Sequence, residues 1–242
     1  MFAAFAWGFG AAFSLVIGGA LALGWKISRR TLGLIMAFGV GVLLSAVSFE
    51  LLEEAFTSTH KSWSLGLGLA AGALTFFVGD VIIDRIGGRK HRAAGGDTGS
   101  GMAIFLGTIL DGIPESIVLG LTLVKGGSIS AAMVVAVFIS NLPEAIGATS
   151  GLRAGKWSRV KIMALWGGVA VASGAASWVG YALFDTASPD VLAFTLAFAG
   201  GALLTMLASS MMPDAFKDSG KAVGLVTTLG FGLAFLLTML TS

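Results

Sequence analysis

Long apolar segments separated by short polar ones dominate the chain. A helix needs about 20 mostly apolar residues to cross the hydrocarbon core of a bilayer. Eight segments have that length, at approximately 2–24, 31–55, 62–86, 101–123, 129–152, 161–184, 190–212 and 222–241. The connections are short except for the polar, glycine-rich stretch 87–99. The pattern predicts an all-α polytopic membrane protein with eight transmembrane helices in one domain, residues 1–242.

The composition supports the same class of protein. The chain is 56% hydrophobic and only 12% charged, about half the roughly 25% charged content of a soluble domain. Its 36 glycines are typical of transmembrane helices that pack closely. The absence of cysteine excludes disulfides and thiolate metal sites. A net charge of only +2 gives no reason to expect a nucleic-acid partner, and membrane lipid is the expected surrounding.

The basic residues are distributed asymmetrically between the two sides of the membrane. If the eight helices alternate in direction, all of the 15 basic residues except Lys61 and Lys125 fall on one side. Loops that are rich in Lys and Arg stay in the cytoplasm. We therefore expect loop 87–99 in the cytoplasm and both termini outside.

An internal repeat links the second and seventh segments. Residues 37–56, AFGVGVLLSAVSFELLEEAF, align without gaps with residues 197–216, AFAGGALLTMLASSMMPDAF. The two helices would run in opposite directions, which indicates an inverted repeat of helices 1–3 and 6–8 around a central pair, helices 4 and 5. Inverted repeats are typical of transporters, with the substrate site near the midplane where the repeats meet. The alternative is chance similarity between helices rich in Gly, Ala and Leu.

The fourth segment carries two acids near its midpoint, in the stretch LDGIPESIVLG. Asp111 and Glu115 are one helical turn apart and so share a face. Pro114 has no N–H to donate to the carbonyl of Leu110, which leaves that oxygen available as a ligand. The helix should bend there.

The fifth segment repeats this arrangement in the stretch SNLPEAIG. Ser140 and Glu144 are again one turn apart, and Asn141 lies three residues before Glu144. Pro143 frees the carbonyl of Ile139 in the same way. At about 1.5 Å rise per residue, both clusters lie close to the bilayer midplane.

Acids at this depth require a physical explanation. Insertion of one central carboxylate costs about 2.5–3.5 kcal/mol, and every lysine and arginine lies in or near a loop. Protonation or a bound cation would remove the cost, and the carboxylate, amide, hydroxyl and carbonyl oxygens suit a divalent cation. The alternative is a pair of kinked helices whose protonated acids hydrogen-bond each other.

These residues resemble the metal site of the ZIP (Zrt/Irt-like) divalent-metal transporters. Glu115 and Glu144 match the two glutamates of the family's Pro-Glu motifs on helices 4 and 5. Pro114 and Pro143 match its prolines, and Asn141 matches a frequent ligand position. The resemblance covers the whole chain, from helix count to topology and inverted repeats.

The resemblance implies transport of a divalent cation toward the cytoplasm, with no catalytic cofactor. The cation is the substrate and belongs to the class of zinc, iron, manganese or cadmium. Elevator or rocking motion of one helix group against another would expose the site alternately. The resemblance further implies a prokaryotic plasma membrane and a homodimer.

Several residues depart from the family pattern. Asp111 stands where the family usually has a histidine ligand, and Gly112 replaces an asparagine. Ser209 and Ser210 occupy the place of a His-Glu pair that many family members have in helix 7. The family often has a carboxylate in helix 6, which this chain lacks, and Ser173 is the nearest polar candidate there. We therefore expect one metal position built from oxygen ligands. Such ligands favour Mn²⁺ or Fe²⁺ over zinc.

Other acids are candidates for an entry or exit path. Glu50, Glu53 and Glu54 end the second helix on the outer side, where they would concentrate cations or form an ordinary interfacial helix end. Asp80 and Asp214 lie toward the cytoplasmic ends of the third and seventh helices. Asp80 is the better candidate for the exit path because it lies deeper.

Two other classes of function fit the sequence less well. An intramembrane serine protease needs a histidine at membrane depth, whereas His60 and His91 lie in loops, and no His-Glu-x-x-His motif is present. The Val78-Gly79-Asp80 stretch lacks the first glycine of the GxGD aspartyl-protease motif. We therefore expect no enzymatic activity. A metal-binding sensor without transport is the alternative function, because the usual histidines are missing.

Overall fold

The computed structural model describes residues 2–59, 62–85, 112, 115–124 and 131–241, and their regular elements are helical. In chain order these are α1 (Phe2–Gly24), α2 (Arg29–Ala46), the π-helical segment η1 (Val47–Leu52), α3 (Glu53–Ser58), α4 (Ser62–Arg85), α7 (Ala131–Ala154), α8 (Arg159–Phe184), α9 (Pro189–Met206), the π-helical segment η3 (Leu207–Met211), α10 (Met212–Ser219) and α11 (Ala222–Thr241).

Seven helices within the described residues are long and apolar enough to cross a membrane. They confirm the all-helical membrane class. The elements α2, η1 and α3 form one continuous span, as do α9, η3 and α10. The eighth expected helix, 101–123, falls mostly outside the described residues. Of it, Gly112 and the stretch from Glu115 to Leu121 are helical.

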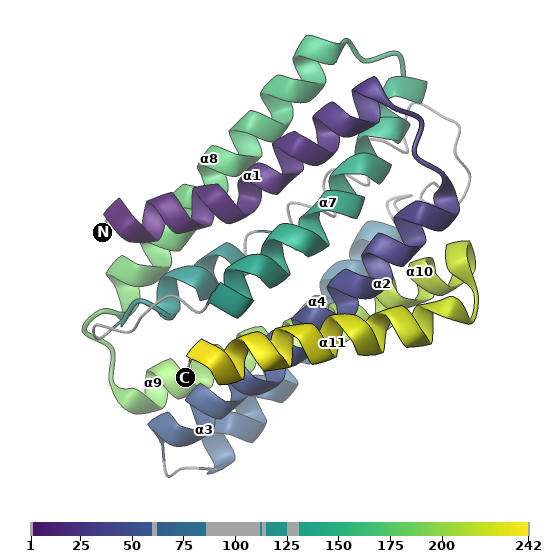
Figure 1. Cartoon of the computed structure of the whole chain (residues 1–242). Helices are drawn as coiled ribbons and strands as arrows, with labels where there is room; N and C mark the ends of the chain where they lie inside the picture. Colours follow the sequence, from purple (N-terminus) through teal and green to yellow (C-terminus); the bar gives the residue numbers. More distant parts are fainter. Residues whose placement is uncertain (1, 60–61, 86–111, 113–114, 125–130, 242) are drawn as a thin grey trace.

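The helices form two groups (Figure 1). One contains α1, which packs against both α8 and α7. The other contains α2 packed against α11, and α4 packed against α9. Contacts between α2 and α7 join the groups, so α7 lies at the boundary between them.

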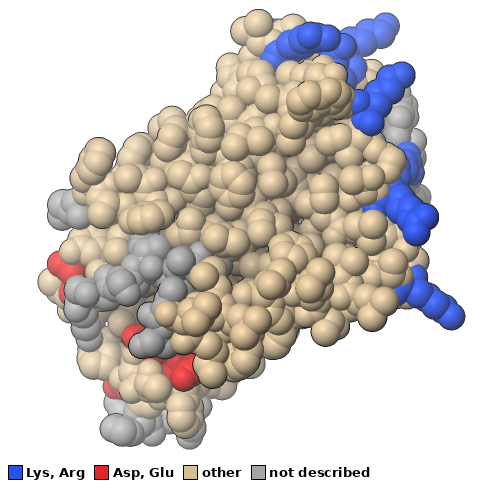
Figure 2. Space-filling model, in the orientation of Figure 1, with Lys and Arg blue, Asp and Glu red and all other residues tan. Residues whose placement is uncertain are grey.

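The basic side chains gather at one end of the molecule. Figure 2 shows them at the right-hand end, opposite the end where Figure 1 places both termini. Every Lys and Arg whose side chain is described is exposed: Lys26, Arg29, Arg30, Arg153, Lys156, Arg159, Lys161, Lys217 and Lys221. This is the asymmetry that the sequence predicted. It leaves the apolar flanks of the bundle free of positive charge.

Glycines bring α2 and α11 into direct backbone contact. A Cβ added at Gly41 would overlap the carbonyl oxygen of Thr227, and one added at Gly230 would overlap that of Phe38. Lipid tails are as apolar as side chains, so helix association in a membrane depends on such close packing. These two contacts fix the register of α2 against α11.

The same arrangement occurs between α9 and α4. A Cβ at Gly201 would overlap the carbonyl oxygen of Leu69, and one at Gly72 would overlap that of Phe198. Gly201 and Phe198 are the positions that align with Gly41 and Phe38 in the sequence repeat. The pair α9–α4 thus reproduces the contacts of the pair α2–α11.

The π-helical segments also occupy aligned positions. In η1 the N–H of Val47 bonds to the carbonyls of Leu43 and Leu44. In η3 the N–H of Leu207 bonds to those of Leu203 and Leu204, each of which is 160 residues further on. Segments of π-helix are rare and frequently mark functional sites. The sequence pattern gave no indication of them.

Hydrogen bonds at the helix ends show that the two long spans run antiparallel. At the end of α3, the hydroxyl of Thr59 donates to Asp190 at the start of α9, at 2.6 Å. At the end of α10, the hydroxyl of Ser219 donates to the carbonyl of Arg30 at the start of α2, at 2.8 Å. Each bond joins the end of one span to the beginning of the other.

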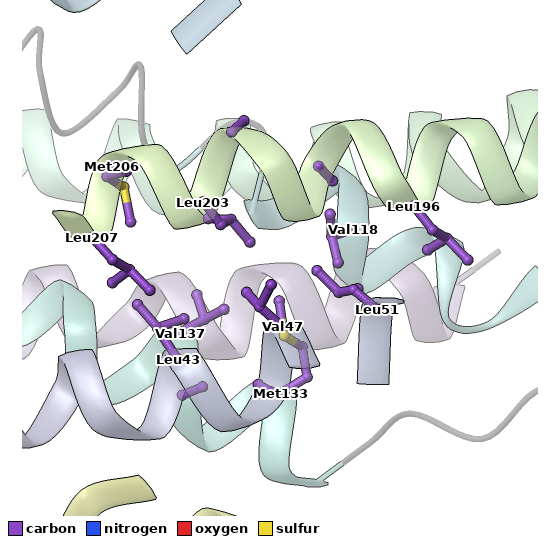
Figure 3. Packing of buried hydrophobic residues seen from close by; sticks show 14 of the residues in the cluster. Leu43, Val47, Leu51, Val118, Met133, Val137, Leu196, Leu203, Met206 and Leu207 are labelled. Atoms are coloured by element: carbon purple, nitrogen blue, oxygen red, sulfur yellow. The ribbon is translucent and has the colours of Figure 1, made fainter. Parts of the chain in front are cut away.

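A hydrophobic cluster fills the space between the antiparallel spans and α7. Figure 3 shows Val47 and Leu51 of η1 in the same cluster as Leu207 of η3 and Val137 of α7. Val118, from the described part of the fourth segment, lies in it as well. The cluster connects both π-segments to the two central helices.

We predict that Gly72→Ala lowers the free energy of unfolding by about 1–3 kcal/mol, the usual cost of overpacking. The added methyl group would meet the carbonyl of Phe198 and push α4 away from α9. Gly66→Ala is the matched control on the same helix, because no heavy atom lies within 4 Å of its added Cβ. Unfolding in detergent measures both, and equal stabilities would contradict the prediction.

Candidate functional site

The described part of the fourth segment buries its glutamate. Glu115 is only 1% exposed, and the neighbouring Ser116 is 2% exposed. The hydroxyl of Ser116 donates to the carbonyl of Gly112 one turn earlier, at 2.7 Å, which satisfies it within the helix. Asp111 and Pro114, which complete the predicted site on this helix, lie outside the described residues.

The second half of the predicted site lies on α7. Ser140 is completely buried, Asn141 is 2% exposed and Glu144 is half-buried. Pro143 lies inside the helix, as the sequence predicted. The hydroxyl of Ser140 donates to the carbonyl of Val137 at 3.1 Å. A serine, an asparagine and a glutamate therefore lie within two turns of a membrane-length helix.

The two halves border the same hydrophobic cluster. Val118 and Val137 both belong to it, and Glu115 precedes Val118 by about one turn, as Val137 precedes Ser140. Glu115 and Ser140 are therefore each about one turn away from a member of the same cluster. No group of three His, Cys, Asp or Glu side chains that could hold a metal occurs among the described residues. Asp111 is outside them, so a three-carboxylate site stays a prediction.

Glycines of two other helices pack against α7 beside these residues. A Cβ at Gly39 of α2 would lie 3.3 Å from the Cα of Ser140. A Cβ at Gly18 of α1 would lie 2.8 Å from the carbonyl oxygen of Leu142. Neither glycine is recognisable from the sequence as part of the site, because neither has a side chain that carries chemistry. Their role is to let two helices approach the backbone of α7.

A buried hydrogen bond fixes the C-terminal half of α7. The indole Nε1–H of Trp166 on α8 donates to the hydroxyl of Thr149 on α7, at 2.8 Å. Both residues are completely buried. A Cβ at Gly19 of α1 would contact the Trp166 ring at 2.5 Å. The three helices α1, α7 and α8 thus meet at one indole ring, which the sequence did not predict.

The acids predicted for an entry or exit path occupy different environments. Glu50 lies in η1, where its Oε1 accepts a hydrogen bond of 2.8 Å from the hydroxyl of Thr238 on α11. Glu53 and Glu54 are exposed on α3, and Asp214 is half-buried on α10. Asp80 is only 8% exposed on α4. Glu50 and Asp80 are therefore integrated into the bundle, whereas Glu53 and Glu54 form its surface.

The basic side chains that are described lie at the exposed end of the bundle, away from the solvent-shielded Glu115. Each lysine or arginine with a described side chain is exposed at the end of the bundle, whereas Glu115 is buried. A buried carboxylate is stable only when it is protonated or compensated by nearby charge or hydrogen bonds. The chemistry available here is that of oxygen ligands: carboxylate, amide and hydroxyl.

Comparison with known proteins adds no further assignment. No family model matches this sequence, and neither does any curated protein.

We predict that Trp166→Phe destabilises the protein through loss of the bond to Thr149. Hydrogen bonds between transmembrane helices contribute about 0.6 kcal/mol on average and at most about 1.7. A double-mutant cycle with Thr149→Val, measured by unfolding in detergent, should give a coupling energy in this range. Trp178→Phe on the exposed face of the same helix serves as control. Additive effects of the two changes would refute the coupling.

Proposed function

We propose that this protein transports divalent metal cations across the membrane through a site shared by the fourth transmembrane segment, 101–123, and the fifth, which is α7. The observation that carries the proposal is the burial of Glu115, together with Ser140 and Asn141, inside a bundle of membrane-spanning helices. A polar group at such a place is expensive and is usually functional. A cation that binds to the carboxylate oxygens would compensate the cost.

The internal correspondence of α2–η1–α3 with α9–η3–α10 supports transport in particular. We interpret it as the inverted repeat that the sequence predicts. In transporters built from inverted repeats, the substrate binds near the midplane between the repeats. Here α7 contacts both helix groups, so relative motion of the groups would open the site to alternate sides.

The proposed ligands favour a hard cation. Glu115, Glu144, Asn141 and Ser140 offer only oxygen atoms, and Asp111 adds another carboxylate. Oxygen ligands suit Mn²⁺ and comparable ions better than imidazole does, although carboxylates bind zinc as well. We therefore propose manganese or iron as preferred substrates, with zinc and cadmium also accepted.

A metal sensor without transport is the second candidate function. One observation favours it: Ser209 and Ser210 lie in η3, at positions where the ZIP family has a His-Glu pair. Loss of these ligands would weaken a path between the central site and the cytoplasm. A sensor would bind metal without moving it.

The proposed orientation follows from the positions of the charges. The basic end of the bundle (Figure 2) would face the cytoplasm, because loops rich in Lys and Arg are retained there. Both termini would then lie outside. A prokaryotic plasma membrane and a homodimer complete the proposal and rest on the family resemblance alone.

The transport proposal predicts uptake of Mn²⁺, Fe²⁺, Co²⁺, Zn²⁺ or Cd²⁺ into proteoliposomes. Glu115→Gln and Glu144→Gln should each reduce it by about tenfold or more, because each substitution removes a charged ligand at nearly constant volume. Asp185→Asn, a change of an exposed acid at the end of α8, is the matched control and should leave uptake unchanged.

Three outcomes separate the hypotheses. Uptake that survives both glutamine substitutions would refute the site. Metal binding without uptake would favour the sensor. Neither binding nor uptake of any of these ions would refute both.

The choice of ligand atoms leads to a separate prediction about selectivity. Asp111→His replaces an oxygen ligand by imidazole, which zinc accepts more readily than manganese does. The ratio of Zn²⁺ to Mn²⁺ uptake should therefore rise, as measured by competition between the two ions in proteoliposomes. An unchanged ratio would show that Asp111 does not contact the cation.

A further inference from the structure

The connection between α7 and α8 is strongly basic. This α7–α8 turn, residues 153–161, belongs to the basic end of the bundle (Figure 2). Its charged side chains are all exposed: Arg153, Lys156, Arg159 and Lys161. The sequence has no Asp or Glu between Glu144 and Asp185. No neighbour along the chain therefore compensates the positive charge of this turn.

A second basic turn at the same end of the bundle has a different charge balance. The α10–α11 turn, residues 214–221, contains the exposed Lys217 and Lys221. It also contains Asp214 and Asp218, which are both half-buried. The two turns therefore offer a comparison within one molecule: acids balance the charge of the α10–α11 turn, whereas the α7–α8 turn carries positive charge alone.

The backbone of the α7–α8 turn holds Lys156 in an unusual conformation. Its φ is 61°, and among the described residues no other non-glycine residue has a positive φ. The N–H of Lys156 donates to the carbonyl of Arg153 at 2.9 Å, and that of Trp157 donates to the carbonyl of Leu152 at 3.1 Å. This is the Schellman pattern, in which the left-handed position is usually glycine.

The α10–α11 turn uses glycine for the same purpose. Gly220 ends α10 with a φ of 61°, the value found at Lys156. A side chain in this region of φ is strained, whereas glycine is not. Strained residues cluster where a ligand is bound. The α7–α8 turn therefore carries a lysine where the backbone alone would favour glycine.

Apolar side chains place the α7–α8 turn at the boundary of the membrane. Trp157 packs against the cluster that contains Trp166, as does Leu23 at the end of α1. Val160, between two basic residues at the start of α8, is 79% exposed, and Trp25 is 69% exposed. Tryptophan is typical of the level of the lipid headgroups. The basic side chains of the turn therefore lie at the depth of the lipid phosphates.

We infer that the α7–α8 turn binds the headgroup of an anionic phospholipid, whose phosphate Lys156 and its basic neighbours hold. Clusters of Lys and Arg beside the end of a membrane helix attract anionic lipids. Ammonium and guanidinium groups donate strong hydrogen bonds to phosphate oxygens. The exposed Val160 would contact the acyl chains of the same lipid. The inference is independent of metal transport.

Native mass spectrometry of the purified protein in a non-ionic detergent tests this site. Wild type should bind phosphatidylglycerol in preference to phosphatidylcholine, which has no net charge. Lys156→Gln with Arg159→Gln should weaken phosphatidylglycerol binding by about tenfold or more, because each basic residue near a membrane surface contributes about fivefold. Lys217→Gln with Lys221→Gln removes the same charge from the α10–α11 turn and should bind as wild type does.

Two outcomes would overturn the inference. Equal binding of the two lipids by wild type would exclude recognition of the charged headgroup. Equal losses in the two double variants would show that only the net charge of this end matters. Inorganic phosphate, added at the concentration of the lipid, should not displace phosphatidylglycerol. Displacement would show a site for a soluble anion and would overturn the assignment to a lipid.

Lys156→Gly separates lipid binding from stability. Glycine adopts this φ without strain, so the melting temperature without added lipid should stay the same or rise. Binding of phosphatidylglycerol should nevertheless weaken by about fivefold, because one positive charge is lost. Unchanged binding in this variant would overturn the role of Lys156, whatever its melting temperature. Loss of metal uptake in wild type would refute the proposed function and leave these lipid tests intact.

Discussion

The direct backbone contact between α2 and α11, and between α9 and α4, is the constraint on which the rest of the structure depends. A membrane offers no hydrophobic force that drives helices together, so the distance at which they can pack determines how strongly they associate. Glycine at Gly41 and Gly230, and at Gly72 and Gly201, allows approach to carbonyl oxygens that any other residue would block. Once these contacts are made, the register of each pair is fixed. Glu50 and Thr238 then lie within hydrogen-bond distance.

The two π-segments place residues of the α2 and α9 spans in the hydrophobic cluster at the centre of the bundle. Each inserts wider backbone turns at the same place in its span, immediately after the carbonyl pairs that accept from Val47 and Leu207. Both of these residues enter the cluster shared with α7. The π-segment η1 carries an acid, Glu50, whereas η3 carries Ser209 and Ser210. A nearly symmetric frame therefore supports different polar groups at its two ends.

Hydrophobic length predicted the spans well because a bilayer imposes it directly. The first helix is the clearest case: 2–24 was expected and Phe2–Gly24 is observed. The second and seventh helices continue to Ser58 and Ser219, beyond the expected ends at 55 and 212. They do so because helical backbone hydrogen bonding continues through the polar residues that follow each apolar segment. The burial of Ser140 and Asn141 agrees with the sequence prediction, because polar residues inside an apolar segment must face protein.

Other features could not be read from the sequence. A π-segment leaves no periodic pattern, and the bond between Trp166 and Thr149 depends on how α8 crosses α7. Gly18 and Gly39 looked like ordinary small residues until their neighbours were known. The geometry between Glu115 and Glu144 depends on Asp111 and Pro114, which lie outside the described residues. The burial of Ser140 and Asn141 was therefore predictable from residue types, whereas the packing that surrounds them was not.

The packing around α7 limits where a cation could be coordinated. Gly39 of α2 lies against the backbone of Ser140 on one flank, and Gly18 of α1 lies against Leu142 on another. Contact this close leaves no space for a cation between α7 and the backbone of α2 at Gly39, or between α7 and the backbone of α1 at Gly18. The fourth segment reaches the same cluster through Val118 and carries Glu115 one turn earlier. Among the described carboxylates, Glu115 is thus the one whose helix and burial fit a site shared with α7.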